Sequence, residues 1–222
     1  MSKGKKDCLF GIVCDGIGGL EEGENASGYV VRQVMSWFRT NGYKRKSRKK
    51  LESEVSQLLF QIHEELKAYG EGKGIKLGTT MTFFLIHKNL IFWGHAGDSR
   101  LYLIKKGRVK QLTVDHKEAD GALNQAIGAG DWKLISTGWK HFWSGESVLL
   151  CTDGFYRSFS NEEIRGCLDR EFMSERQIQR MLVQMGQRAS AMGEKDNISA
   201  LFCRKSQKRR MKEEGNEADM ET

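Results

Sequence analysis

The sequence predicts an α+β protein with β-sheets in the middle and helices in pairs outside. Short apolar runs joined by tight turns fill residues 79–113, which is typical of an antiparallel meander. Two helical patterns precede this block and two follow it, because their apolar residues recur every three or four positions. The order is therefore a strand, two long helices, a meander, a strand, two helices and a strand.

Length and composition predict one soluble domain. At 222 residues the chain can bury a sizeable core. Its hydrophobic fraction of 39% and charged fraction of 29% are ordinary for a globular protein. No apolar run approaches the length of a membrane span, so we expect no association with a membrane. The short apolar run after the first lysines ends in Asp-Gly rather than in small residues, which excludes a signal peptide.

The five cysteines are widely spaced and lie mostly in apolar runs. They form neither a CxxC pair nor a cluster with histidine at zinc spacing. We interpret them as buried, reduced thiols, which predicts a cytoplasmic location.

The net charge of +7 comes mainly from residues 44–50, which hold six basic residues and no acidic residue. We interpret this segment as a solvated loop between two helices, with an anion-attracting patch as the alternative. A nucleic-acid surface would be wider and interleaved with aromatic residues, so no nucleic-acid partner is expected.

The first half of the chain gives clear element boundaries. Residues 8–14 predict a buried strand, and apolar residues at helical spacing follow from Ala26. Apolar residues from Leu51 to Leu66 predict a second helix, which is expected to end in the glycine-rich stretch 69–74. The strands expected next are 79–86, 90–95, 100–104 and 108–113.

The second half begins with residues 114–146, the least regular part of the sequence, followed by a strand at 147–151. Two capping-box signatures begin two helices: Ser160 with Glu163, and Ser174 with Gln177. A last strand is expected at 198–203. The domain should cover residues 1–204, and the charged residues 205–222 should form a disordered tail.

Four acidic residues share one setting, since each lies where a strand meets a loop. They are Asp15, Asp98, Asp153 and Asp196. Loop residues held by a rigid sheet are typical site residues. Acids that meet at one rim of a sheet would repel each other unless a cation lay between them, and oxygen ligands alone favour magnesium or manganese over zinc. Taken alone, Asp15-Gly16 is also compatible with a simple strand-to-helix turn.

Seven short motifs occur in a fixed order between residues 8 and 203. They are Asp15-Gly16-Ile17-Gly18-Gly19, Gly78-Thr79-Thr80, Gly97-Asp98-Ser99-Arg100, Gln111-Leu112-Thr113-Val114-Asp115-His116, Ala126-Ile127-Gly128, Leu149-Leu150-Cys151-Thr152-Asp153-Gly154 and Asp196-Asn197-Ile198-Ser199. Together they resemble the motifs of the PPM/PP2C-type metal-dependent protein serine/threonine phosphatases, in their bacterial form.

The resemblance implies a four-layer αββα sandwich, with two antiparallel sheets and a helix pair on each outer face. It also implies two, and with Asp98 three, Mg²⁺ or Mn²⁺ ions. In such a centre Asp15 would bridge two ions and the Gly16 carbonyl would bind one of them. Asp153 and Asp196 would hold the other ion, and Asp98 with Asp153 the third. The residues implied to support these ligands are Gly18, Gly19 and Asn197.

The implied reaction is hydrolysis of phosphoserine or phosphothreonine on a protein by a metal-activated water, without a side-chain nucleophile. The implied substrate is a phosphorylated protein, the opposing enzyme is a serine/threonine kinase, and the phosphatase is expected to be a monomer.

Three departures from the family pattern leave a second interpretation open. Ile17 stands where some members have histidine. The residues before Asp15 hold neither the family's phosphate-binding arginine nor its Asn-x-Asp element, so we expect an N-terminal strand segment to be missing. The stretch from His116 to Ala126 is short, so the flap over the site is expected to be reduced. The alternative is a catalytically weak or inactive regulatory module.

Overall fold

The structure is a computed structural model that describes residues 2–5, 8–17, 22–40, 43–44, 46–170 and 173–205, the first four by their backbone only. Its strands are β1 (Ser2–Lys5), β2 (Cys8–Val13), β3 (Met81–His87), β4 (Leu90–Ala96), β5 (Arg100–Lys105), β6 (Arg108–Gln111), β7 (Ser136–His141), β8 (Ser147–Cys151) and β9 (Ala200–Arg204). Its helices are α1 (Gly23–Arg39), α2 (Arg48–Lys73), α3 (Asp153–Tyr156), α4 (Asn161–Leu168) and α5 (Glu175–Ala191).

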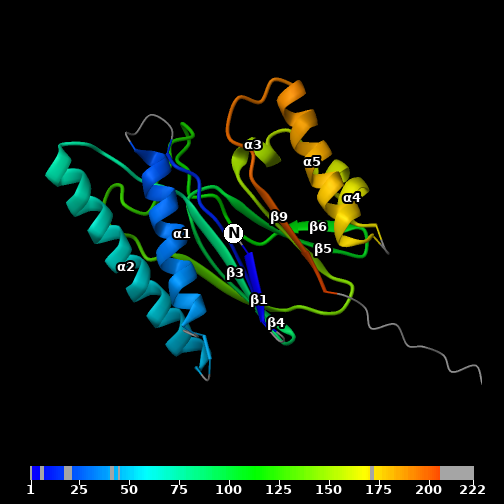
Figure 1. Ribbon diagram of the computed structural model, residues 1–222, viewed down its shortest axis with the longest axis horizontal. Coiled ribbons are helices and arrows are strands. Elements are labelled where there is room, and N and C mark those ends of the chain that lie inside the picture. The colour runs from blue at the N-terminus through cyan, green and yellow to red at the C-terminus, as the bar shows by residue number, and fades with distance from the viewer. Residues whose placement is uncertain are drawn as a thin grey trace, which may run out of the picture.

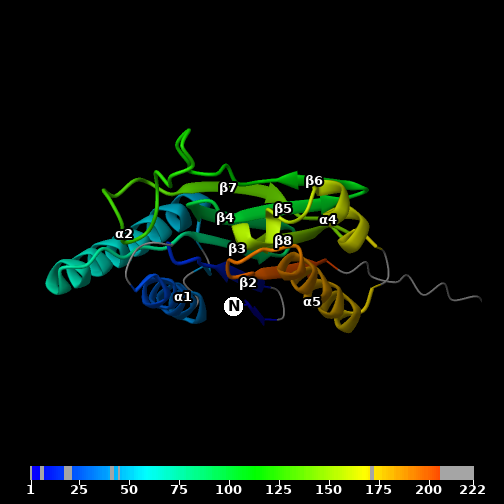
Figure 2. The ribbon, with the colours of Figure 1, turned by 90° about the horizontal axis from the view of Figure 1, so that it is seen from above.

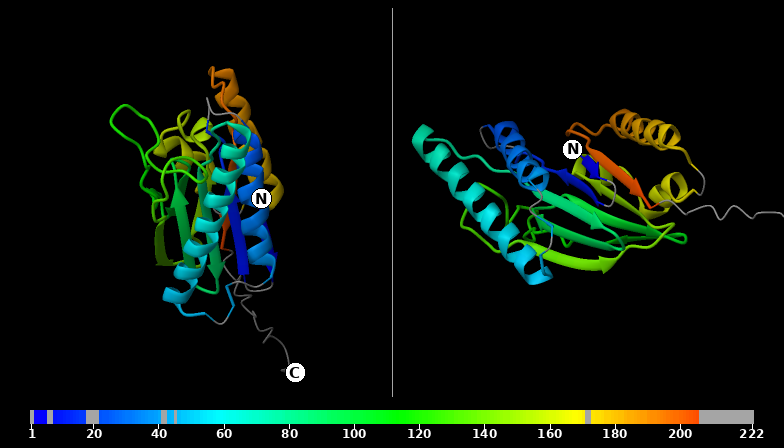
Figure 3. Two further views of the ribbon diagram at one scale, coloured as in Figure 1. Left: turned by 90° about the vertical axis from the view of Figure 1, so that its left-hand side faces the viewer. Right: turned by 60° about the horizontal axis from the view of Figure 1, so that its bottom comes forward.

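The strands form two antiparallel sheets, which confirms the predicted α+β class. One sheet has the order β1-β2-β3-β4-β7 and the other the order β6-β5-β8-β9. Helices α1 and α2 lie on one side of the molecule, and α4 and α5 lie on the other (Figure 1, Figure 2). The tilted view in Figure 3 separates the two helix pairs, with the sheets between them.

Three apolar layers hold these elements together. The first lies between α1, α2 and the first sheet and contains the stacked rings of Phe10 and Phe38, whose centroids are 4.9 Å apart. The second lies between the two sheets, with Phe84 and Leu150 among its members. The third joins the second sheet to α4 and α5 through residues such as Met185. The central strands are covered on both faces, which explains why they are continuous apolar runs in the sequence.

Helix α2 is longer than predicted. It begins at the Ser47 cap, whose hydroxyl accepts a hydrogen bond from the Lys50 amide, and it continues through the glycines to Lys73. Gly70 is required by packing, because a Cβ there would lie 2.7 Å from Leu77 Cδ2. The turn that ends the helix is at Gly74, which has a φ of 69°. Close packing thus overrides the low helix propensity of glycine, and the helix ends at Lys73, within the stretch 69–74 where its end was predicted.

Two strands and one short helix were not predicted. The polar strand β7, in the region expected to be irregular, pairs with β4, and its Trp139 ring stacks on Phe92 with centroids 4.5 Å apart. Strand β1 pairs with β2 in the part of the chain where a strand segment was expected to be missing, so that expectation was wrong for residues 2–5. Helix α3 begins at Asp153 itself. Edge strands such as β1 and β7 carry little apolar patterning, which is why the sequence did not reveal them.

The C-terminal half agrees closely with the sequence. Both predicted capping boxes are formed, at Ser160 and at Ser174. Lys205, however, belongs to the fold rather than to the tail, because its ammonium donates to the Phe142 carbonyl at 2.9 Å and to Asn89 Oδ1 at 2.6 Å. The other residues of the predicted tail, 206–222, lie outside the described part of the chain.

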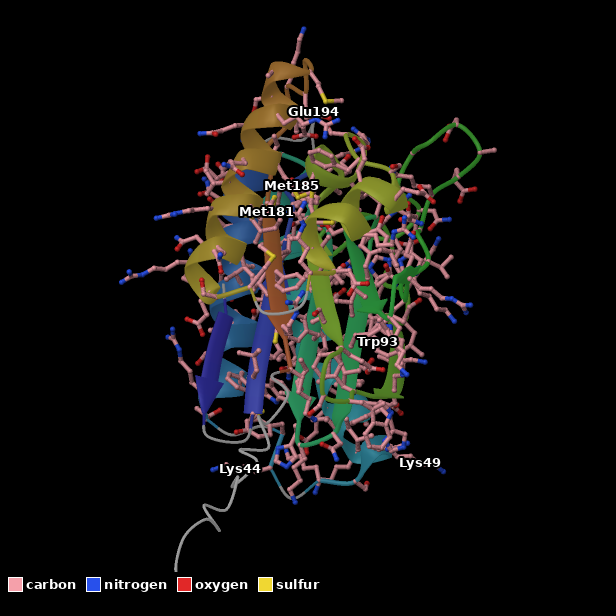
Figure 4. All side chains as sticks on the ribbon, turned by 90° about the vertical axis from the view of Figure 1, so that its right-hand side faces the viewer. Lys44, Lys49, Trp93, Met181, Met185 and Glu194 are labelled. Atoms are coloured by element: carbon pink, nitrogen blue, oxygen red, sulfur yellow. The ribbon has the colours of Figure 1, made fainter. Side chains whose placement is uncertain are left out.

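Part of the basic segment is used inside the fold. Lys46 forms an ion pair with Glu54, and the Arg48 guanidinium lies 5.2 Å from the centroid of the Trp139 ring. Figure 4 shows Lys44 and Lys49 at the end of the molecule opposite to Glu194. Among the described residues, no helix is both long and apolar enough to cross a membrane.

Candidate active site

The backbone around Asp15 is fixed by the segment that leads into β3. The Asp15 carbonyl accepts hydrogen bonds from the Thr80 amide and the Thr79 hydroxyl, both at 2.8 Å. The Asp15 amide donates to Thr80 Oγ1 at 3.0 Å, and the Ile17 amide donates to the Gly78 carbonyl at 3.0 Å. The Gly-Thr-Thr motif therefore holds the Asp-Gly motif from the side.

Gly16 lies against the first turn of α1. A Cβ on Gly16 would be 2.5 Å from the carbonyl carbon and oxygen of Gly23, so no other residue fits without moving the helix. The Gly16 carbonyl therefore lies in a close turn, and Gly16 has no side chain that could shield it. Gly18 and Gly19, which the resemblance names as supporting residues, lie outside the described part of the chain.

The loop after β4 places Asp98 near the same motif. Gly97 has a φ of 103°, and a Cβ there would be 2.6 Å from Thr80 Cβ. Thr80 Oγ1 also lies 2.9 Å from Ser99 Oγ. Asp98 is buried, and its Oδ2 forms an ion pair with Lys117 Nζ at 2.6 Å.

Asp153 and the loop before β9 come together through the end of β8. Asp153 is buried at the start of α3, where its Oδ1 accepts a hydrogen bond from the Gly154 amide at 2.8 Å. The Thr152 hydroxyl donates to the Asn197 carbonyl at 3.2 Å, and a Cβ on Gly154 would be 2.7 Å from that oxygen. Asp196 accepts from the Asn197 amide at 2.7 Å. Asn197 therefore supports the site through its backbone.

The electrostatics show that the four acids lie within reach of one another. Burial, the charges of Asp153, Asp196 and Asp98, and a hydrogen bond shared with the Asp153 carboxyl together raise the pKa of Asp15 to about 7, with burial the largest cause. Burial also raises the pKa of Asp153, as do Asp98 and Asp196, while Arg157 opposes them. Like charges that are held close together in this way favour a cation between them.

Two basic side chains balance part of this negative charge, and neither was predicted from the sequence. Arg157 pairs with Asp153 Oδ2 at 2.6 Å, and Lys117 pairs with Asp98. The spacing of four residues between Asp153 and Arg157 was a signal that could have revealed the first pair. Lys117 carried no such signal, because its position depends on where the loop after β6 returns.

The donor set suits a hard cation, since it consists of carboxylate and carbonyl oxygens. Within the described ranges, no three acidic, histidine or cysteine side chains are arranged closely enough to enclose a metal ion. The site thus has the right donor chemistry and mutual repulsion for divalent metals, with two of its carboxylates turned toward Lys117 and Arg157.

A second layer of polar side chains holds the Asp98 turn in place. His95 is fully buried, its Nε2 lies 3.0 Å from the Val114 carbonyl, and its Nδ1 lies 2.8 Å from Thr82 Oγ1. The neighbouring ring of His116, whose centroid lies 4.6 Å from that of His95, accepts a hydrogen bond from the Gly97 amide at 3.1 Å.

This buried histidine predicts a pH dependence of stability. Burial and the neighbouring His116 lower the pKa of His95 from 6.5 to about 4. Between these pH values the unfolded chain binds a proton that the folded chain does not, so stability falls as the pH drops from 6.5 to 4 and this loss levels off below 4. We expect urea unfolding at several pH values to show that the free energy of unfolding falls by about 3 kcal/mol more in the wild type than in His95→Gln between pH 6.5 and pH 4. The glutamine side chain does not titrate. Equal pH profiles for the two proteins would contradict the prediction.

The comparisons with known proteins agree with this geometry. The model of the family described as protein phosphatase 2C matches residues 1–201. The chain is 24% identical over 217 residues to the serine/threonine phosphatase stp of Listeria welshimeri, covering 88% of this chain and 84% of that protein. It is 30% identical over 179 residues to the protein phosphatase PhpP of Streptococcus pneumoniae, covering 69% of this chain and 70% of that protein.

Solved structures show the same fold. The serine/threonine phosphatase of S. agalactiae superimposes with a TM-score of 0.76 at 21% identity, covering 92% of this chain and 91% of that one. The Mycobacterium tuberculosis serine/threonine phosphatase PstP/Ppp gives a TM-score of 0.75 at 20% identity, covering 93% and 92%. The family match over nearly the whole chain, together with this fold and the four converging acids, shows that the chain belongs to the protein phosphatase 2C family.

Proposed function

We propose that the protein hydrolyses phosphoserine and phosphothreonine on other proteins with the help of Mg²⁺ or Mn²⁺. The observation that carries the proposal is the gathering of Asp15, Asp98, Asp153 and Asp196, which come from four distant parts of the chain and whose charges raise the pKa values of Asp15 and Asp153. Such repulsion is costly to stability, and it is typical of sites where function rather than folding selects the residues.

Each ligand that we propose is held by a different part of the fold. Asp15 and the Gly16 carbonyl are held by the Thr79-Thr80 segment, and Asp153 is held by the first turn of α3. Asp196 would complete the main set of ligands, and Asp98 would hold a further ion together with Asp153. Divalent ions bound there would acidify a water molecule and neutralise the charge of the phosphoryl oxygens.

The residues of the chain then have defined tasks. The carboxylates orient and hold the cations, while the surrounding backbone hydrogen bonds prevent these side chains from moving apart. No side-chain nucleophile is required, because the attacking group is water. Cys14 and Cys151 have pKa values raised above the usual range by burial, so they remain neutral thiols without a catalytic task.

The substrate and the setting follow from the same proposal. The proposed substrate is a protein that a serine/threonine kinase has phosphorylated, as the names of the similar Listeria phosphatases suggest. The cysteines are thiols, which supports a reducing, cytoplasmic setting. We propose that the protein acts there as a monomer.

The alternative of an inactive regulatory module is not favoured. All four acids are present and within electrostatic reach of one another, and the relatives that align along most of the chain are named phosphatases. Ile17 replaces a histidine of some members, which removes a proton donor but leaves the four carboxylates in place.

Metal removal tests the proposed function. We expect the purified protein to hydrolyse p-nitrophenyl phosphate and a phosphothreonine peptide with Mn²⁺ or Mg²⁺, to lose at least about 100-fold of this activity in EDTA, and to regain it when Mn²⁺ is restored. The melting temperature should rise with Mn²⁺, since a ligand present at about 100 times its Kd adds about 2.7 kcal/mol to folding stability. Undiminished hydrolysis in EDTA, or no hydrolysis with either metal, would refute the proposal.

A further inference from the structure

The loop of residues 123–133, which contains the Ala126-Ile127-Gly128 motif, forms one wall of a pocket next to the candidate active site. The pocket has a volume of about 330 Å³ and includes Ile17, the residue directly after the proposed ligand Gly16. The loop contributes residues 123–126, 129–131 and Lys133 to the lining. What holds this loop therefore decides the shape of the space beside the metal site.

The beginning of the loop is held firmly to the sheet. The Ile127 amide donates to the Thr79 carbonyl at 2.9 Å, and the Thr79 amide donates to the Ile127 carbonyl at 3.0 Å. The two arms of the loop are also tied to each other, because Gln125 Nε2 donates to the Leu134 carbonyl at 3.0 Å and Lys133 Nζ donates to the Asn124 carbonyl at 2.7 Å. None of these bonds involves residues 128–132, so another part of the fold must hold that segment.

Helix α2 supplies that contact through His63. The Gly128 amide donates to His63 Nδ1 at 3.0 Å, at a position where Gly128 has a φ of 89°. The Trp132 ring packs edge-on against both His63 and Phe60, with centroids 5.4 and 5.6 Å apart. His63 thus contacts the loop at two points, although it lies 65 residues away from Gly128 in the sequence.

The hydrogen bond from Gly128 fixes which nitrogen of the His63 ring carries the proton. Since Nδ1 accepts a hydrogen bond, the neutral ring carries its proton on Nε2. This Nε2 is buried and has no hydrogen-bond partner among the described residues, and the nearest carboxylate oxygen, Glu64 Oε1, is 3.9 Å away. A buried donor without a partner lowers the stability of the folded protein. The bond from the Gly128 amide is the hydrogen bond that the ring of His63 makes to this loop.

We propose that His63 is a positioning residue that holds residues 128–133 against helix α2 and so shapes the pocket beside Ile17, which accepts the polypeptide next to the phosphorylated residue. This inference rests on the proposed phosphatase function. Because Ile127 has its own bonds to Thr79, losing the His63 contact should loosen the outer wall of the pocket and leave Asp15 and Gly16 in place.

Two substitutions at His63 test separately the hydrogen bond to Gly128 and the ring contact with Trp132. His63→Phe keeps a ring for Trp132 but removes the acceptor for Gly128. His63→Asn keeps an acceptor close to the position of Nδ1 and removes the partnerless Nε2 donor. His141→Phe, on the exposed end of β7, is the matched control for a change of histidine to phenylalanine.

Hydrogen exchange measures the anchor directly, without any activity. We expect the Gly128 amide to exchange about 10-fold faster in His63→Phe than in the wild type, and His63→Asn and His141→Phe to remain within about 3-fold. Unchanged exchange at Gly128 in His63→Phe would overturn the proposed anchor. If His63→Phe does not fold, faster exchange at Gly128 in the acceptor-retaining His63→Asn would equally overturn it.

Kinetics with two substrates measure the consequence. In His63→Phe we expect KM for a phosphothreonine peptide to rise about 5-fold, while kcat and KM for p-nitrophenyl phosphate stay within about 2-fold, with His63→Asn restoring the peptide KM. Equal losses on both substrates, or none, would overturn the role in shaping the pocket. If the wild type hydrolysed neither substrate, the proposed function would fail, and the exchange measurement would still decide whether His63 holds the loop.

Discussion

Replacing Asp15 by asparagine is expected to make the metal-free protein more stable while lowering its phosphatase activity at least about 100-fold. Burial and the neighbouring carboxylates raise the pKa of Asp15 to about 7, so its ionised form is disfavoured in the folded state. Asparagine has nearly the same shape and no charge, and its amide can donate to Asp153 without taking up a proton. We therefore expect folding stability to increase by about 1 kcal/mol.

The activity should change in the opposite direction. An amide supplies one neutral oxygen where the proposed centre requires a bridging carboxylate, so metal affinity and the activation of water should both fall. The measurements are urea unfolding in EDTA, and kcat/KM for p-nitrophenyl phosphate over a range of Mn²⁺ concentrations. The activity loss corresponds to about 3 kcal/mol or more of transition-state stabilisation.

A matched control is Asp120→Asn. Asp120 is exposed, and its Oδ1 accepts a hydrogen bond from the Ala122 amide at 2.9 Å, which asparagine can also accept. In this variant the free energy of unfolding should change by no more than about 0.5 kcal/mol, and the activity by no more than about twofold. If Asp15→Asn destabilised the metal-free protein, repulsion among the four acids would not be the dominant force at Asp15.

Replacing Arg100 by lysine is expected to lower the free energy of unfolding by about 2 kcal/mol. The Arg100 guanidinium binds both oxygens of Asp115, with Nη2 to Oδ2 at 2.7 Å and Nε to Oδ1 at 3.0 Å. It also donates to the Tyr102 hydroxyl at 3.1 Å and lies 3.7 Å from the centroid of the Tyr156 ring. Lysine has a single charged nitrogen, so it cannot keep the two-point contact, the tyrosine bond and the stacking together.

The size of the Arg100 effect follows from the burial of the pair. The side chains of Arg100 and Asp115 are 28% and 18% exposed, so the pair lies between a surface ion pair, which contributes under about 1 kcal/mol, and a buried pair, whose disruption costs about 3–5 kcal/mol. For a chain of this length, we expect the melting temperature to fall by about 4–8 °C.

A double-mutant cycle with Asp115→Asn isolates the interaction between the two side chains. The coupling free energy should be about 1–2 kcal/mol, because the two residues share a hydrogen-bond network. Arg108→Lys on the exposed edge of β6 should leave the unfolding free energy within about 0.5 kcal/mol. A coupling energy near zero would show that the cost of Arg100→Lys arises from the lost contact with Tyr156 instead.

Much of the fold and the main acids of the site could be predicted because they depend on local patterns. Strand β8 was predicted with its observed bounds, since four of its five residues are apolar and all five are buried. The capping boxes at Ser160 and Ser174 were predicted because a serine and an acidic or amide side chain three residues later complete each other within one turn. Asp15, Asp98, Asp153 and Asp196 stood out because each lies at the end of a strand.

Features that depend on distant partners were not predicted. Strand β7 forms because β4 offers it hydrogen bonds and an apolar surface for Trp139, although its own sequence is mostly polar. Helix α2 continues past Gly70 because Leu77 packs where a side chain would otherwise lie. Lys117 reaches Asp98 because the loop after β6 returns to β4.

By itself, the sequence determined the fold class, the order of most elements and the set of acids, because periodicity, caps and strand ends depend on residues that are close together in the sequence. Only the tertiary structure decided how close those acids lie, which basic side chains balance them and how the loop after Ile127 is held. His63 illustrates the difference: alone in the sequence it is an isolated histidine, and its bond to Gly128 exists only because folding brings α2 and this loop together.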